Sequence, residues 1–152
     1  MRLRTEIDPS GEEEIILRCK RLDEKTSAIY RYIESALSGG SEMELTLGDR
    51  EFFVPQSAIL FFETEDGKTV AHTATAMLYS QYKLCELETL LPATFVRVSK
   101  SCILNSALVS SITKNLTGSS MVCFKGTKKI AYVSRLYYKV LKDKIHETRF
   151  AK

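Results

Sequence analysis

The 152-residue sequence lacks several features that mark common protein classes. It has no tryptophan and only two histidines, and no apolar stretch is long enough to span a membrane. The first ten residues carry charges in place of the apolar core of a secretion signal. Hydrophobic residues make up 44% and charged residues 27%, which is the composition of a folded globular protein and not of a disordered or fibrous one. We therefore expect a cytoplasmic globular protein.

Catalytic and metal-binding motifs are also missing. The sequence contains no Walker loop, no glycine-rich dinucleotide loop, no nucleophile elbow, and no zinc-protease or calcium-loop motif. The four cysteines form no CxxC pair and are widely spaced, at Cys19, Cys85, Cys102 and Cys123. Free thiols in a reducing compartment explain them better than disulfides or zinc ligation. We expect no enzymatic activity, no metal, no cofactor and no small-molecule substrate.

The charge is distributed unevenly along the chain. Residues 1–66 hold eight Lys/Arg and fifteen Asp/Glu, a balance of −7, whereas residues 67–152 hold fourteen and four, a balance of +10. A strongly basic half indicates a polyanionic partner. An acidic half would repel that partner and restrict it to one side of the protein. The alternative is that the asymmetry serves only solubility.

The N-terminal segment, residues 1–41, is predicted to form a hairpin and a helix. Two strands, Arg2–Glu6 and Ile15–Cys19, flank a turn containing Pro9 and Gly11. The helix that follows ends at Gly39-Gly40 and carries an apolar stripe of Leu22, Ile29, Ile33 and Leu37. About forty residues are too few to fold alone. The segment therefore either covers the main domain or buries its stripe in the second subunit of a homodimer.

Residues 42–152 are predicted to form the main domain. Alternating or short apolar runs bounded by turn residues predict strands at 43–47, 52–54, 58–62, 70–72, 95–98, 102–104, 108–112, 121–125 and 129–133. The run at 58–62 is apolar on both faces, which indicates a central strand. Short helices are expected at Leu84–Leu91 and after Ser134. The fold class is therefore mostly β (α+β).

Three cations of the basic half stand beside small polar residues at turns or strand ends: Lys68, Lys100 and Arg135. Such side chains can reach a nucleic-acid groove without steric blockage, where they bind guanine or phosphate. Lys128 and Lys129 add charge that attracts phosphate. Any one of these residues alone is typical of a solvated surface, so the prediction depends on the group.

Four stretches of the main domain resemble a known family. They are ILFFETEDGK at 59–68, LCELETLLP at 84–92, FVRVSKSCILN at 95–105 and VSR at 133–135. In this order and spacing they are similar to the LytTR-type DNA-binding domain of bacterial regulators, over roughly residues 43–148.

The resemblance implies an elongated stack of small antiparallel sheets whose loops, in place of a recognition helix, enter successive major grooves of duplex DNA. The positions of Lys68, Lys100 and Arg135 coincide with those that the family uses. The predicted DNA-binding set is Lys68, Thr69, Ser99, Lys100, Ser101, Lys128, Lys129, Ser134 and Arg135. The family signature commonly has His where this chain has Ser99. The N-terminal segment is too short for the receiver domain of many members, so we expect the stand-alone type, some of which a membrane-protein partner restrains.

These observations predict a sequence-specific transcriptional regulator that binds double-stranded DNA, with bases read by the three cations and phosphates bound mainly by the serines and the other lysines. The alternative is a protein-interaction or ligand-sensing β-module whose basic face docks an acidic protein. Single-stranded RNA binding is a weaker alternative, because no paired aromatic residues lie on adjacent predicted strands as stacking platforms.

Overall fold

The structure is a computed structural model that describes residues 2–37 and 41–150. In these residues it has ten strands, three α-helices and two 3-10 turns. The helices are α1 (Glu24–Leu37), α2 (Leu84–Leu90) and α3 (Tyr138–Phe150). The strands are β1 (Glu42–Leu47), β2 (Arg50–Pro55), β3 (Ile59–Glu65), β4 (Lys68–Thr73), β5 (Met77–Ser80), β6 (Phe95–Ser99), β7 (Cys102–Asn105), β8 (Val109–Thr113), β9 (Ser120–Phe124) and β10 (Ile130–Val133).

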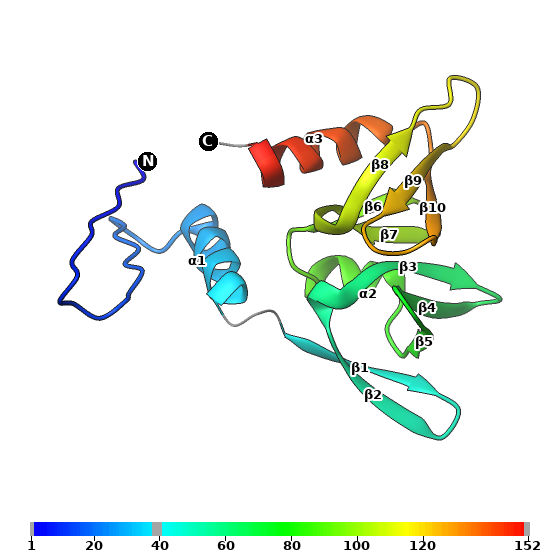
Figure 1. The fold of residues 1–152 in the computed structure, drawn as a ribbon, viewed down its shortest axis with the longest axis horizontal. Helices are drawn as coiled ribbons and strands as arrows, with labels where there is room; N and C mark the ends of the chain where they lie inside the picture. Colours follow the sequence, from blue (N-terminus) through cyan, green and yellow to red (C-terminus); the bar gives the residue numbers. More distant parts are fainter. Residues whose placement is uncertain (1, 38–40, 151–152) are drawn as a thin grey trace.

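The strands form two antiparallel sheets (Figure 1). The larger sheet has seven strands in the order β2-β1-β5-β4-β3-β7-β6, and the smaller has three in the order β10-β9-β8. Strand β3 lies inside the larger sheet between β4 and β7, and its first four residues are buried. The predicted mostly β class with short helices is confirmed, and so is the central place of the strand at 58–62.

The core lies on both faces of the larger sheet. Because side chains alternate along a strand, neighbouring Phe61 and Phe62 enter different apolar clusters. Phe62 packs in the cluster that contains Leu84 and Leu87 of α2. Phe61 packs in the cluster built from the smaller sheet and Leu141 of α3. The smaller sheet and α3 are thus fixed against the part of the larger sheet formed by β3, β7 and β6.

Strand β5 was not predicted. It has only four residues, of which Leu78 alone is buried, while Met77 and Tyr79 are exposed. Its place in the sheet depends on pairing with β4 and with Thr46 of β1. A single buried side chain gives too little alternation for a sequence-based prediction.

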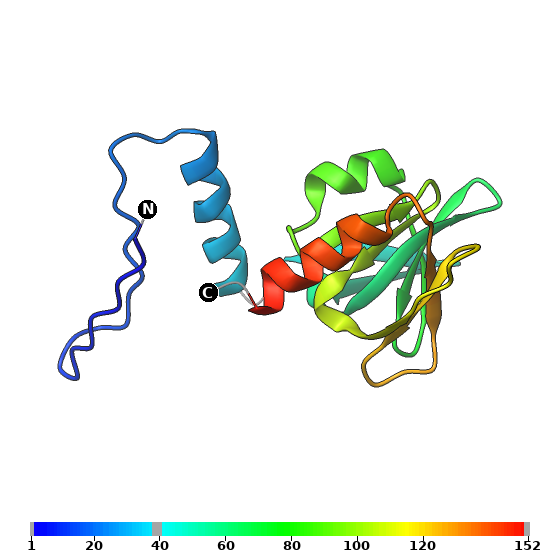
Figure 2. The same ribbon diagram turned by 90° about the horizontal axis from the view of Figure 1, so that it is seen from above.

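The predicted N-terminal hairpin is wrong. Residues 2–23 contain no strand, and they run as an extended chain beside α1, away from the sheets (Figure 2). The turn itself is present, because the amide of Gly11 donates to the carbonyl of Asp8 at 3.2 Å. The flanking apolar side chains, such as Ile15 and Ile16, stay largely exposed, so they pack into no core that would align two strands.

The predicted helix is confirmed as α1, and its first turn explains where it begins. The Asp23 carboxylate accepts hydrogen bonds from the Thr26 amide at 2.8 Å and the Thr26 hydroxyl at 2.7 Å. These bonds lower the pKa of Asp23 and satisfy an amide that the helix leaves free. The predicted Gly39-Gly40 stop lies outside the described residues.

Candidate nucleic-acid interface

Three turns from distant parts of the sequence meet at one end of the sheets. The β3–β4 turn lies beside the β6–β7 turn, because the Thr64 amide donates to the Ser101 carbonyl at 2.9 Å. The chain leaving β10 lies beside the end of β6, because the Ser134 amide donates to the Val98 carbonyl, also at 2.9 Å. The turns that carry Lys68, Lys100 and Arg135 therefore form one edge, which we call the turn edge.

The β3–β4 turn is a tight reversal. Asp66 and Gly67 both have positive φ, 51° and 75°, which is typical of the two-residue turns that match the twist of paired strands. Lys68 follows as the first residue of β4, and its ammonium lies 5.6 Å from the centre of the Tyr79 ring, within cation–π range. Glu65 and Asp66 are exposed at the same tip, so this turn carries both signs of charge.

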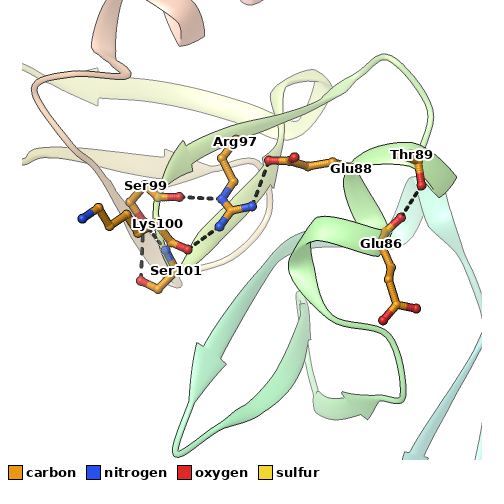
Figure 3. A network of polar contacts seen from close by, with 7 residues as sticks. All are labelled: Glu86, Glu88, Thr89, Arg97, Ser99, Lys100 and Ser101. Carbon is orange, nitrogen blue, oxygen red and sulfur yellow. Dashed lines mark hydrogen bonds and ion pairs between the residues drawn. The ribbon is translucent and has the colours of Figure 1, made fainter.

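The β6–β7 turn is held by Arg97. Its Nε donates to the Ser99 carbonyl at 2.7 Å, and its Nη2 donates to the Lys100 carbonyl. The Ser99 hydroxyl accepts the Ser101 amide at 3.2 Å, which closes the turn from the other side. Figure 3 shows the Lys100 side chain directed away from the Arg97 guanidinium. The turn thus presents an exposed ammonium on a backbone fixed by side-chain hydrogen bonds.

The β10–α3 turn presents the third cation. Ser134 is half-buried where it joins β6, and Arg135 is exposed directly after it. The Tyr137 amide donates to the Ser134 carbonyl at 3.0 Å, and α3 is anchored by the fully buried Leu141. In residues 2–37 and 41–150 neither Lys100 nor Arg135 forms an ion pair. Both charges are available to an anion or to a base edge.

The remaining predicted contacts are not exposed on this edge. Thr69 is only 8% exposed, between β3 and β5. Lys128 and Lys129 precede β10 and therefore lie at its opposite end from Arg135. There the Lys129 ammonium donates to the Ala76 carbonyl at 2.7 Å, and burial lowers the pKa of Lys129. The structure brings together Lys68, Ser99, Lys100, Ser101, Ser134 and Arg135. Thr69 follows Lys68 but is buried, and Lys128 and Lys129 lie at the other end of β10.

A buried histidine lies in the sheet behind the turn edge. The Nε2 atom of His72 is 2.7 Å from a carboxylate oxygen of Glu63, and its ring stacks on Phe61 at 4.2 Å between ring centres. Its Nδ1 atom is buried without a hydrogen-bond partner. Burial lowers the pKa of His72, although the hydrogen bond to Glu63 opposes this shift. A neutral ring that donates from Nε2 fits this site, because protonation would leave a buried N–H at Nδ1 without an acceptor.

Cys102 is a buried free thiol. Burial raises the pKa of the Cys102 thiol to about 12, so the reactive thiolate does not form at neutral pH. No group of three or more His, Cys, Asp or Glu side chains in residues 2–37 and 41–150 is placed to hold a metal ion. None of the helices in these ranges is long and apolar enough to cross a membrane.

Residues 49–146 match the model of the LytTr DNA-binding domain. The chain belongs to the LytTR DNA-binding domain family. One similar solved structure is described as the LytTr DNA-binding domain of a methyl-accepting/DNA response regulator from Bacillus cereus. It is 25% identical, the alignment covers 70% of this chain and 98% of that one, and the TM-score is 0.64. The curated proteins include no match.

The match confirms the family predicted from the four sequence stretches, and residues 49–146 fall within the predicted range 43–148. The LytTR domain is a DNA-binding domain, which makes DNA the expected partner. Arg97 is the residue at this edge whose role the sequence did not predict. It lies inside the FVRVSKSCILN stretch, where alternation with the buried Val96 and Val98 marks it only as a strand residue on the other face.

Proposed function

We propose that this chain is a sequence-specific transcriptional regulator that places the turn edge against the major groove of duplex DNA. The observation that supports this most is the convergence of Lys68, Lys100 and Arg135, from three separate turns, at one end of a rigid double-sheet scaffold. A long cation at each turn can contact guanine or phosphate, and rigid strands fix the distances between them.

The size of the turn edge fits one stretch of a DNA helix. The strands that carry it run in the order β4-β3-β7-β6, and the end of β10 follows β6. Four spacings of about 4.8 Å between neighbouring strands give an edge about 19 Å wide. One turn of the double helix is about 34 Å long. The whole edge can therefore approach a duplex within a single helical turn, so we propose contact with one major groove in place of the successive grooves that the resemblance implied.

We assign different roles to the residues of the edge. Lys100 and Arg135 contact base edges, because they are exposed and form no ion pair within the described part of the chain. Lys68 joins them once its ammonium leaves the Tyr79 ring. We assign the phosphate contacts to Ser99, Ser101 and Ser134. Thr69 is left out because it is buried, and Lys128 and Lys129 because they lie at the far end.

The salt dependence of binding tests this function. A duplex selected from a random library by the full chain is titrated at several salt concentrations. If cations of the edge neutralise phosphates, log K falls linearly with log salt by about 0.9 for each phosphate contacted. Lys68, Lys100 and Arg135 neutralise nearby phosphates even where they contact base edges, so we expect about three neutralised phosphates and therefore a slope steeper than about −2.5. A flat response would contradict duplex binding by this edge and favour an acidic protein as the partner.

We also propose that two copies associate through α1. Leu22 and Leu37 are 75% and 67% exposed, and together with Ile33 they line an apolar cavity of about 500 Å³ between α1 and the extended N-terminal chain. A second α1 laid in this groove would remove these side chains from water. Regulators that bind paired half-sites commonly do so as dimers.

Ile29→Glu is expected to weaken self-association, because a carboxylate would enter the apolar stripe of α1. Light scattering of the full chain measures the mass in solution. Arg31→Glu is the matched control, since Arg31 is exposed on the same helix outside the stripe. A monomeric mass for both the unmodified chain and Ile29→Glu would remove the dimer from the proposal.

A further inference from the structure

We infer that Arg97 is a positioning residue for the turn Ser99–Ser101, and that Glu88 of α2 holds Arg97 in its place. The inference rests on the proposed function, because the turn matters for binding only if Lys100 contacts DNA. It adds a helix on the sheet face, away from the turn edge, to the residues that determine DNA binding.

Each of the three nitrogens of the Arg97 guanidinium donates a hydrogen bond within the protein. Its Nε and Nη2 donate to the carbonyls of Ser99 and Lys100, and its Nη1 donates to a Glu88 carboxylate oxygen at 2.9 Å (Figure 3). All three nitrogens thus have an acceptor within the chain. The pairing of β6 with β7 shifts register between Arg97 and Ser99, where the backbone leaves the regular sheet. A planar fork with fixed donors is suited to hold such a segment in one shape.

Glu88 connects this fork to the core. It lies on α2, whose Leu84 and Leu87 are buried against the larger sheet, so the helix that carries its carboxylate is fixed. The Arg97 side chain is 24% exposed and that of Glu88 is 45% exposed. Partial burial strengthens the pair relative to one in open solvent. The position of the Lys100 ammonium therefore depends on α2 through two side chains.

The sign of the expected effect separates this role from simple electrostatics. Glu88 is a negative charge near a surface proposed to bind a polyanion, so charge alone predicts that Glu88→Ala tightens DNA binding. Loss of the Arg97 anchor predicts the opposite, because Lys100 must then be ordered upon binding.

The test measures binding of the full chain to the selected duplex at several salt concentrations, with thermal melting to verify the fold. Glu88→Ala is expected to weaken binding about threefold to tenfold, with an unchanged melting temperature and salt slope. Arg97→Lys is expected to weaken it similarly, because an ammonium keeps the charge but not the fork. Glu88→Gln, whose amide oxygen still accepts a hydrogen bond, should restore most of the loss.

Double-mutant cycles test whether Glu88 affects DNA binding through Lys100. In a Lys100→Ala background Glu88→Ala should have little further effect, whereas in an Arg135→Ala background it should keep its full effect. Equal losses in both backgrounds, or tighter binding by Glu88→Ala, would overturn the positioning role. If Lys100→Ala itself leaves binding unchanged, the proposed use of this turn fails instead, and that result is read independently of Glu88.

Discussion

Replacing Lys100 and Arg135 together by alanine is expected to weaken binding to the selected duplex by about 2–6 kcal/mol. Each side chain contributes about 1–3 kcal/mol if it contacts a base with two hydrogen bonds. The two residues lie on different turns and share no side-chain hydrogen bond among those of the described residues, so their effects should be nearly additive. Band-shift titration at fixed salt measures the change.

The sequence preference should change together with the affinity. Lys100→Ala is expected to relax discrimination at one part of the site and Arg135→Ala at another, because each contacts different base pairs. Lys128→Ala is the matched control, since it removes an exposed positive charge at the opposite end of β10. Unchanged affinity and unchanged preference in both single variants would refute the assignment of these two residues.

Acid is expected to destabilise the domain through His72. Because burial lowers the pKa of His72 below its ordinary value of 6.5, the unfolded chain takes up a proton more readily than the folded chain. The neutral His72 ring therefore stabilises the folded domain fully above pH 6.5. This stabilisation is lost as the pH falls toward the pKa of His72 in the folded state. Within that interval the free energy of unfolding should fall by up to about 1.4 kcal/mol per pH unit.

Urea denaturation at pH 7.5, 6.5 and 5.5 measures this dependence. His72→Gln should flatten it, because an amide can still donate to Glu63 and does not titrate. The other histidine, His146, is exposed on α3, and His146→Gln serves as the matched single-histidine substitution. Parallel curves for the unmodified chain and His72→Gln would show that His72 does not titrate between the two states.

Much of the main domain follows from local patterns. The Asp66-Gly67 pair predicts a tight hairpin because both residues tolerate the positive φ that they adopt. The run at 58–62 predicts a central strand because it is apolar on both faces, and β3 is buried accordingly. The prediction of two N-terminal strands was wrong for the converse reason. Apolar alternation gives a strand only where a partner is present to pair with it, and none meets residues 2–23 in the described structure.

The composition of the turn edge could be predicted only in part. Whether Lys68 and Lys100 are neighbours depends on the order of strands in the sheet and on the Thr64–Ser101 bond, which no local pattern reveals. One signal was present, however. Lys129 precedes β10 and Arg135 follows it, so the two must lie at opposite ends of one strand. The predicted strand at 129–133 was therefore enough to place Lys129 and Arg135 at different ends of the sheet.

The attachment of the three turns to separate strands has a consequence for how binding preferences change. A single recognition helix carries its contacts on one axis, so a shift of that axis moves all of them. Here each tip is supported by its own strands, and among the hydrogen bonds of residues 2–37 and 41–150 neighbouring tips share only main-chain ones. A substitution at one tip should therefore leave the others in place, so that under the proposed function an altered operator is accommodated by single exchanges, one base step after another.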